Sequence, residues 1–235
     1  MSDSFRLGMK KSPNCAQKGR NSFRATGIIV ILAHENHKKE NEMTNEIKFA
    51  DTVMLVDASY VDRVAGDLSA HFGEVVNRKL PKADLPVLLE CLSLDGGIAL
   101  GGNTVQVLFI YDAPSRKMGA FQPSDLEKEL NGVAFKSQLG EFTLYAFEPS
   151  DMTTREDLFL ESLKVVADAK EVKRLIVVPA EEEYGERVPA ILNKVDGKER
   201  MTVFGMNPPS GEAAYQWEML GFAVLQSLGI KADEL

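Results

Sequence analysis

The chain has 235 residues, of which 44% are hydrophobic and 26% charged, a balance typical of a globular protein with a sizeable core. Its formal net charge of −8 is unevenly spread, because residues 1–46 hold 8 basic and 5 acidic residues and residues 47–235 hold the other 19 and 30. This acidic body argues against a broad nucleic-acid-binding face, since phosphate contacts need clustered Lys and Arg. It is compatible with a small basic groove or with a metal site.

The two cysteines, Cys15 and Cys91, have no CxxC partner, so neither a disulfide framework nor a zinc cluster is expected. We expect Cys91, in the apolar stretch LPVLLECL, to be a small core residue, and we expect the protein to be cytoplasmic. The longest apolar run, GIIVILA (27–33), is too short to span a bilayer, and no signal-peptide pattern surrounds it. No membrane partner is therefore expected.

Residues 1–46 are rich in Lys, Asn and Ser and show no lasting periodicity, whereas Met43 begins MTNEIKFADTVMLVD, which reads as a natural start. We expect residues 1–46 to be disordered or an over-extended N-terminal segment, with GIIVILA at most an added strand. No Pro/Gly/Ser-rich linker divides the remainder, so residues 47–235 are expected to form a single α/β domain that ends in a C-terminal helix.

Within this domain, short apolar runs alternate with helical patterns. Five strands are predicted: TVMLVD (52–57), TVQVLFIYD (104–112), EFTLYAFE (141–148), RLIVV (174–178) and MTVFGM (201–206). Helices are predicted from Ser59 with Asp62 in a capping box, over 83–94 with Asp84 as cap, over 124–130, from Thr154, over 185–195 and over 212–228. In the last helix we expect Trp217 to lie on the apolar face and to belong to the core.

The strands are apolar on both alternations, as expected when helices cover both faces of a sheet. Strand–helix alternation then predicts a three-layer α/β/α sandwich with a mostly parallel, five-stranded sheet. In such sheets the functional crevice lies beyond the carboxyl ends of the strands. The side chains that follow each strand are therefore the candidates for a functional site.

Four of the five predicted strands end in acid: Asp57, Asp112, Glu148 and the run Glu181, Glu182 and Glu183. Asp157 and Glu161 add two carboxylates on one face of the helix before RLIVV. The strand ends carry neither His nor Cys, so histidine-based acid–base chemistry is poorly supported. Clustered carboxylates suit hard, oxygen-ligated cations such as Mg²⁺ or Mn²⁺.

Five stretches carry a resemblance through their order along the chain. They are LVDASY (55–60), IYDAP (110–114), REDLFLESL (155–163), VVPAEEEYGERVPAIL (177–192) and TVFGM (202–206). This order resembles the NYN domain, a PIN-like metal-dependent ribonuclease fold, and the resemblance covers about residues 52–206. Glu181 and Glu183 stand where the last motif of that family has aspartates, Tyr184 where it has an aromatic residue, and Ala180 where it has a glycine. Glutamate is longer than aspartate, which moves each carboxylate outward, and metal geometry is sensitive to such displacements.

The resemblance implies metal-dependent hydrolysis of RNA phosphodiesters. It implies one or two Mg²⁺ or Mn²⁺ ions, which would generate the attacking hydroxide and stabilise the leaving oxygen. The implied catalytic and metal-binding residues are Asp57, Asp157 or Glu161, Glu181 and Glu183. The implied phosphate contacts are Arg116, Lys117 and Arg155.

Each acid also has a purely structural interpretation. Asp57 is suited to cap the following helix, Asp112 to form a turn before Pro114, and Asp157 to complete a capping box with Thr154. Glu181 to Glu183 fit the first turn of a helix, where acids interact favourably with the dipole. The second functional hypothesis is therefore a catalytically degenerate NYN-like domain that binds a protein partner or nucleic acid. A nucleotide- or flavin-binding protein is disfavoured because the glycine fingerprint is missing.

Overall fold

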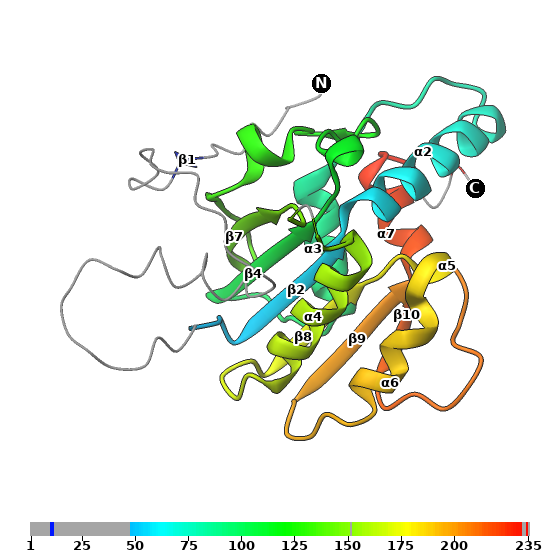
Figure 1. Cartoon of the computed structure of the whole chain (residues 1–235). Helices are drawn as coiled ribbons and strands as arrows, with labels where there is room; N and C mark the ends of the chain where they lie inside the picture. Colours follow the sequence, from blue (N-terminus) through cyan, green and yellow to red (C-terminus); the bar gives the residue numbers. More distant parts are fainter. Residues whose placement is uncertain (1–9, 12–47, 151, 232–233, 235) are drawn as a thin grey trace.

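The computed structural model describes residues 10–11, 48–150, 152–231 and 234 (Figure 1). The expectations for residues 1–46, including a strand at 27–33, lie outside the described residues except at Lys10–Lys11, which form the short strand β1. Within the described part of the chain, no helix is long and apolar enough to cross a membrane.

Eight strands form the main sheet, in the order β1-β6-β7-β4-β2-β8-β9-β10. Besides β1, they are β2 (Thr52–Asp57), β4 (Asn103–Ile110), β6 (Val133–Lys136), β7 (Gly140–Phe147), β8 (Arg174–Val178), β9 (Arg200–Gly205) and β10 (Gln216–Met219). The six strands from β7 to β10 in this order are mutually parallel, whereas β6 pairs antiparallel with β7 and β1 antiparallel with β6. A separate two-stranded sheet consists of β3 (Ala83–Asp84) and β5 (Phe121–Gln122).

The helices are α2 (Ala58–Val75), α3 (Leu85–Asp95), α4 (Arg155–Asp168), α5 (Glu181–Tyr184), α6 (Val188–Leu192) and α7 (Leu220–Ser227). Short 3₁₀ turns are η1 (Ala113–Ser115) and η3 (Gly185–Arg187), and η2 (Leu126–Leu130) is a single π-helical turn. Helices α2 and α3 contact α7, and α4 contacts α6. Figure 1 shows α4 and α6 in front of the sheet, so the two groups of helices cover opposite faces.

The prediction of an α/β fold with a mostly parallel sheet between helices is confirmed. The count of five strands is wrong, because the five predicted strands are β2, β4, β7, β8 and β9, and the sheet adds β1, β6 and β10. The added strands have only two to four residues, too few to show a periodic pattern.

The single helix predicted over 212–228 is also wrong. Residues Gln216–Met219 form the edge strand β10, and only Leu220–Ser227 are helical. The buried positions Leu220 and Val224 belong to the predicted apolar face, but Trp217 lies on β10 and is half-buried instead of being core. The apolar residues keep a helical spacing across the boundary between Met219 and Leu220, so the sequence pattern did not indicate the change from strand to helix.

Two helix starts show how the chain leaves the sheet. Asp84 caps α3 by accepting from the Val87 N–H at 3.1 Å, as predicted. The cap predicted for Ser59 is wrong, because Asp57 caps α2 and the Ser59 hydroxyl donates to Ser115 at 2.5 Å. The capping role of Asp57 fixes its carboxylate at the carboxyl end of β2, where the candidate site lies.

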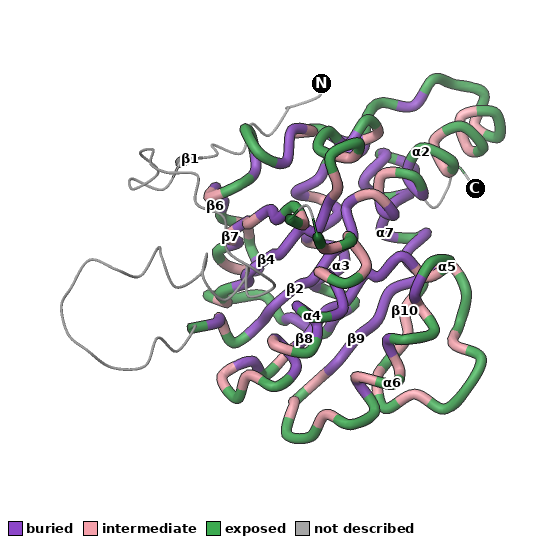
Figure 2. The backbone as a smooth tube through the Cα atoms, viewed as in Figure 1, coloured by how far each residue is buried: buried purple, intermediate pink, exposed green. Residues whose placement is uncertain are grey.

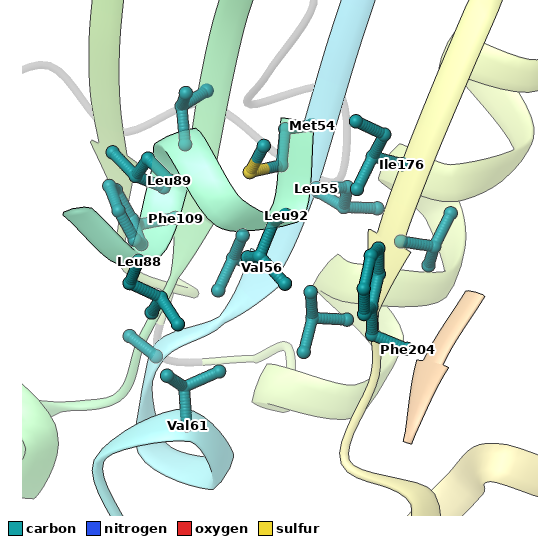
Figure 3. Close-up of a cluster of buried hydrophobic side chains, with 14 of the residues drawn as sticks. Met54, Leu55, Val56, Val61, Leu88, Leu89, Leu92, Phe109, Ile176 and Phe204 are labelled. Carbon is teal, nitrogen blue, oxygen red and sulfur yellow. The ribbon is translucent and has the colours of Figure 1, made fainter. Parts of the chain in front are cut away.

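The core lies on both faces of the sheet, which is almost wholly buried along β2, β4, β8 and β9 (Figure 2). On the α3 side, leucines of that helix pack over the central strands (Figure 3). The fully buried residues in this close-up include Met54, Val56, Leu88, Leu92 and Phe109. Cys91 is buried as predicted, and burial raises the pKa of its thiol to about 11.

Candidate functional site

Asp57 is the centre of the candidate site, at the carboxyl end of β2. Its side chain is fully buried and accepts from the backbone N–H of Tyr60 at 2.9 Å and from the Tyr184 hydroxyl at 2.5 Å. It also accepts from Arg155. Burial raises the pKa of Asp57, although the Arg155 charge and the hydrogen bonds from Tyr184 and Tyr60 act in the opposite direction. Asp57 thus joins the starts of α2 and α4 and the helix α5 through three hydrogen bonds.

Arg155 is the first residue of α4, and its guanidinium lies between three carboxylates. Besides Asp57, it contacts Glu183 through Nη2 at 2.5 Å and Asp112 through Nε at 3.4 Å. Only 11% of the side chain is exposed. Burial works against its charge, but the carboxylates of Asp57 and Glu183 outweigh burial and raise the pKa of Arg155. These carboxylates also offset the unfavourable position of a cation at the positive end of a helix dipole.

The three consecutive glutamates after β8 have three separate partners. Glu183 pairs with Arg155, and Glu182 pairs with Arg63 of α2 at 2.5 Å on the surface. Glu181 accepts from the backbone N–H of Met206 at 2.7 Å and from the side-chain amide of Asn207 at 2.6 Å. Two arginines and the hydrogen-bond donors of Met206 and Asn207, which follow β9, thus offset the repulsion between the adjacent carboxylates.

Glycine at position 205 makes the Glu181 contact possible. A Cβ atom at Gly205 would lie 2.3 Å from Oε2 of Glu181 and 3.3 Å from Nε1 of Trp217. An alanine at this position would push the Glu181 carboxylate away from the backbone N–H of Met206, from which it accepts at 2.7 Å. The glycine of the TVFGM motif therefore has a steric role at the site.

The other predicted site residues lie apart from Asp57. Asp157 exchanges hydrogen bonds with Thr154 in a capping box, and the Thr154 hydroxyl holds the pKa of Asp157 below its usual value. Glu161 lies exposed on α4. Arg116 pairs with Glu148 at 3.1 Å and with Glu127 at 3.4 Å, and Lys117 lies 3.9 Å from Asp125. Of the three predicted phosphate contacts, only Arg155 lies at the acidic cluster.

Asp112 has the turn-forming role that the sequence allowed as an alternative. Its carboxylate accepts from the Ser115 N–H at 3.2 Å and from the Ser115 hydroxyl at 2.5 Å, which caps η1. The same carboxylate faces Nε of Arg155. The end of β4 thus contributes to the cluster around Arg155 from a rigid turn.

The carboxylates implied as metal ligands do not converge on one point. Asp57 and Glu183 flank the Arg155 guanidinium, Glu181 turns toward Met206, and Asp157 is held by its own helix cap. Among the described residues, no group of three or more His, Cys, Asp or Glu side chains is arranged to hold a metal ion. The cation that lies between the carboxylates of Asp57, Asp112 and Glu183 in this arrangement is Arg155.

A family model for a family of unknown function, DUF6621, matches residues 46–235. The chain belongs to the DUF6621 family. No curated protein and no solved structure gives a significant match. The family assignment therefore covers the whole domain described above but brings no activity with it, and the site has to be interpreted from its own residues.

A cavity of about 610 Å³ lies beyond the carboxyl ends of β8 and β9 and is lined by Glu181 and Glu182 of the three consecutive glutamates. Its walls come from the segment after β8, from the turn and helix η3 and α6, from the end of β9 and the following loop, and from Trp217 of β10. Sequence reasoning missed this cavity, because part of its lining comes from β10 and from the irregular loop before it. It also missed Arg63, since nothing in the pattern of α2 relates that residue to Glu182.

Proposed function

We propose that this chain is a protein-binding module of PIN-like architecture in which the acidic crevice does not work as a nuclease site. The observation that carries the proposal is the position of Arg155, whose guanidinium lies between Asp57, Asp112 and Glu183. Arg155 provides the positive charge that a divalent metal would provide in a PIN-like nuclease. On this proposal, the chain shares the architecture of the NYN domain but not its metal-dependent hydrolysis.

A guanidinium cannot take over the chemical role of the metal. Metal-dependent hydrolysis needs a cation with open coordination positions, which lowers the pKa of a bound water. Arginine offers only N–H donors and stays protonated, and the carboxylates around Arg155 raise its pKa further. Asp57 is buried and its oxygens accept from Tyr60, Tyr184 and Arg155, so a metal ion or an attacking water would have to compete with these three groups for the carboxylate.

The charge next to the cluster also favours protein over nucleic acid. Among the residues that the structure describes, those lining the neighbouring cavity include four glutamates and no Lys, Arg or His. A phosphate backbone would meet repulsion there, and nucleic-acid binding depends on clustered cations. Arg116 and Lys117 form ion pairs with nearby acids near the ends of β4 and β7. Arg116 pairs with Glu127 and Glu148, and Lys117 pairs with Asp125.

The proposal is tested by incubating the purified full chain with single-stranded and hairpin RNA in millimolar Mg²⁺ and in millimolar Mn²⁺. The same assay is run on Asp57→Asn and, as a matched control, on Glu74→Gln, which changes an exposed carboxylate of α2 outside the cluster. We expect no cleavage that depends on Asp57. Metal-dependent cleavage that Asp57→Asn abolishes and Glu74→Gln retains would overturn the proposal and restore the nuclease interpretation.

A further inference from the structure

The cavity beyond β8 and β9 is strongly acidic, and two of its carboxylates are unpaired. Its four glutamates are Glu181, Glu182, Glu186 and Glu212. The first two are held by Met206 and Asn207 and by Arg63. In the described part of the chain, the exposed side chains of Glu186 and Glu212 have neither an ion pair nor a hydrogen bond. They approach the cavity from different walls, Glu186 from η3 and Glu212 from the loop before β10.

The cavity lining also contains aromatic and apolar side chains. Tyr215 and Trp217 line the cavity together with Phe204 and several prolines. Trp217 is half-buried, and its indole N–H donates to no acceptor within the described residues. A cation is stabilised over an aromatic face, most strongly over Trp, and additionally by a carboxylate at its edge. The walls thus combine carboxylates with aromatic faces. Together these groups attract a cation that also has an extended apolar or planar portion.

The domain already holds one arginine in this way, because Arg63 lies 5.5 Å from the centre of the Tyr60 ring while it pairs with Glu182, which also lines the cavity. Arg155 shows that the domain also holds an arginine between carboxylates alone. Glu186 and Glu212 beside Trp217 repeat the combination of carboxylates and an aromatic ring without an arginine. We propose that this cavity receives an arginine side chain from an extended segment of a partner protein, an inference that rests on the proposed binding function.

Two features favour a protein segment over a small amine as the source of the cation. The volume of about 610 Å³ lies within the range of roughly 300–1,000 Å³ typical of ligand pockets, and it leaves room for residues on either side of the arginine. On β10, Met219 lies two residues after Trp217 and therefore on the same side of the strand. Met219 is 37% exposed, and the following helix exposes 66% of Phe222. These side chains offer apolar contacts to residues that flank the inserted arginine.

The single tryptophan of the chain makes the inference directly measurable, because all tryptophan fluorescence comes from Trp217 in the cavity wall. The full chain is titrated with an acetylated, amidated Leu-Arg-Leu-Gly peptide and with the same peptide carrying citrulline, the neutral analogue of arginine. We expect a saturable fluorescence change with the arginine peptide that weakens as salt rises, and at least about tenfold weaker binding of the citrulline peptide. Equal binding of the two peptides would overturn the inference.

The variant Glu186→Gln/Glu212→Gln removes the two unpaired carboxylates, and Glu74→Gln/Glu161→Gln is its matched control, with the same change in net charge on exposed positions of α2 and α4. We expect the first pair to weaken binding of the arginine peptide about tenfold and the control pair to leave it unchanged. An equal loss in both pairs would contradict the cavity as the binding site. Free arginine that binds as tightly as the peptide would contradict a protein segment as the ligand.

The outcome is separable from that of the proposed function. Absence of peptide binding together with absence of RNA cleavage would overturn the arginine pocket and leave the binding-module proposal standing. Cleavage of RNA that depends on Asp57 would overturn the binding-module proposal, whatever the peptide titration shows.

Discussion

Replacing Arg155 by Met is expected to destabilise the domain strongly, because the substitution leaves the Asp57 carboxylate buried without its cation. The Asp57 side chain is 0% exposed and that of Arg155 is 11% exposed, so water can replace little of the lost interaction. Removing one partner of such a buried pair costs about 3–5 kcal/mol of unfolding free energy. The contacts of Arg155 with Glu183 and Asp112, whose side chains are 49% and 39% exposed, add at most about 1 kcal/mol each.

The loss of stability in Arg155→Met should depend on pH in a defined direction. Burial already raises the pKa of Asp57 in the folded protein, and Arg155 is the largest influence that lowers it. Without Arg155 this pKa rises further. A group whose folded-state pKa is raised contributes stability below its unfolded pKa, and this contribution is lost as the pH rises through the folded pKa. The difference from the wild type should therefore be larger at pH 8 than at pH 5.

Urea unfolding at both pH values measures this effect, and the expected loss corresponds to a fall in Tm of roughly 6–20 °C for a domain of this size. Arg63→Met is the matched control, since Arg63 and Glu182 form an exposed pair that should contribute no more than about 1 kcal/mol. The double variant Asp57→Asn/Arg155→Met removes the buried charge and should be more stable than Arg155→Met alone. A loss below about 1 kcal/mol in Arg155→Met, or one that the double variant does not reduce, would refute the reasoning.

Three further predictions follow from the same region and from the core. Gly205→Ala should lower the unfolding free energy by about 1–3 kcal/mol in the same urea assay, because its Cβ would lie 2.3 Å from Oε2 of Glu181. Gly211→Ala is the control, since no described atom lies within 4 Å of its new Cβ, and it should change the unfolding free energy by less than about 0.5 kcal/mol. Tyr184→Phe removes a hydrogen bond to Asp57 and should cost about 1.5–3 kcal/mol, and equal stability of the two proteins would show that the hydroxyl does not support this carboxylate. The Cys91 thiol, with a pKa raised to about 11, should react slowly with iodoacetamide at pH 8 when followed by peptide mass spectrometry, and rapid alkylation of the folded chain would contradict its burial.

The parallel core of the sheet was predictable because its strands are apolar on both alternations. The stretches 52–57 and 174–178 were predicted with the bounds of β2 and β8. The prediction failed where the strands are short or depend on tertiary contacts. In β10 the sequence QWEM continues the apolar spacing of α7, and only its pairing with β9 makes it a strand.

At the site, the sequence identified the carboxylates but not their partners. The end of a β-strand fixes where Asp57 and Glu183 emerge, so their proximity to a common rim follows from the alternation of strands and helices. Arg155 was predicted as a phosphate contact, and its real direction could not be derived, since a long side chain at a helix start can reach either solvent or the crevice. Likewise, nothing local in EEEY indicates that three successive carboxylates have three different partners.

The central claim, that Arg155 is the cation of the acidic crevice, is tested most directly by isothermal titration of the wild-type chain and of Asp57→Asn with Mn²⁺. If Arg155 holds Asp57 and Glu183 as the structure shows, neither protein should give a saturable heat of binding at up to millimolar Mn²⁺. One saturable Mn²⁺ site in the wild type that is lost in Asp57→Asn would contradict the account, because the metal would then take the place assigned to the guanidinium.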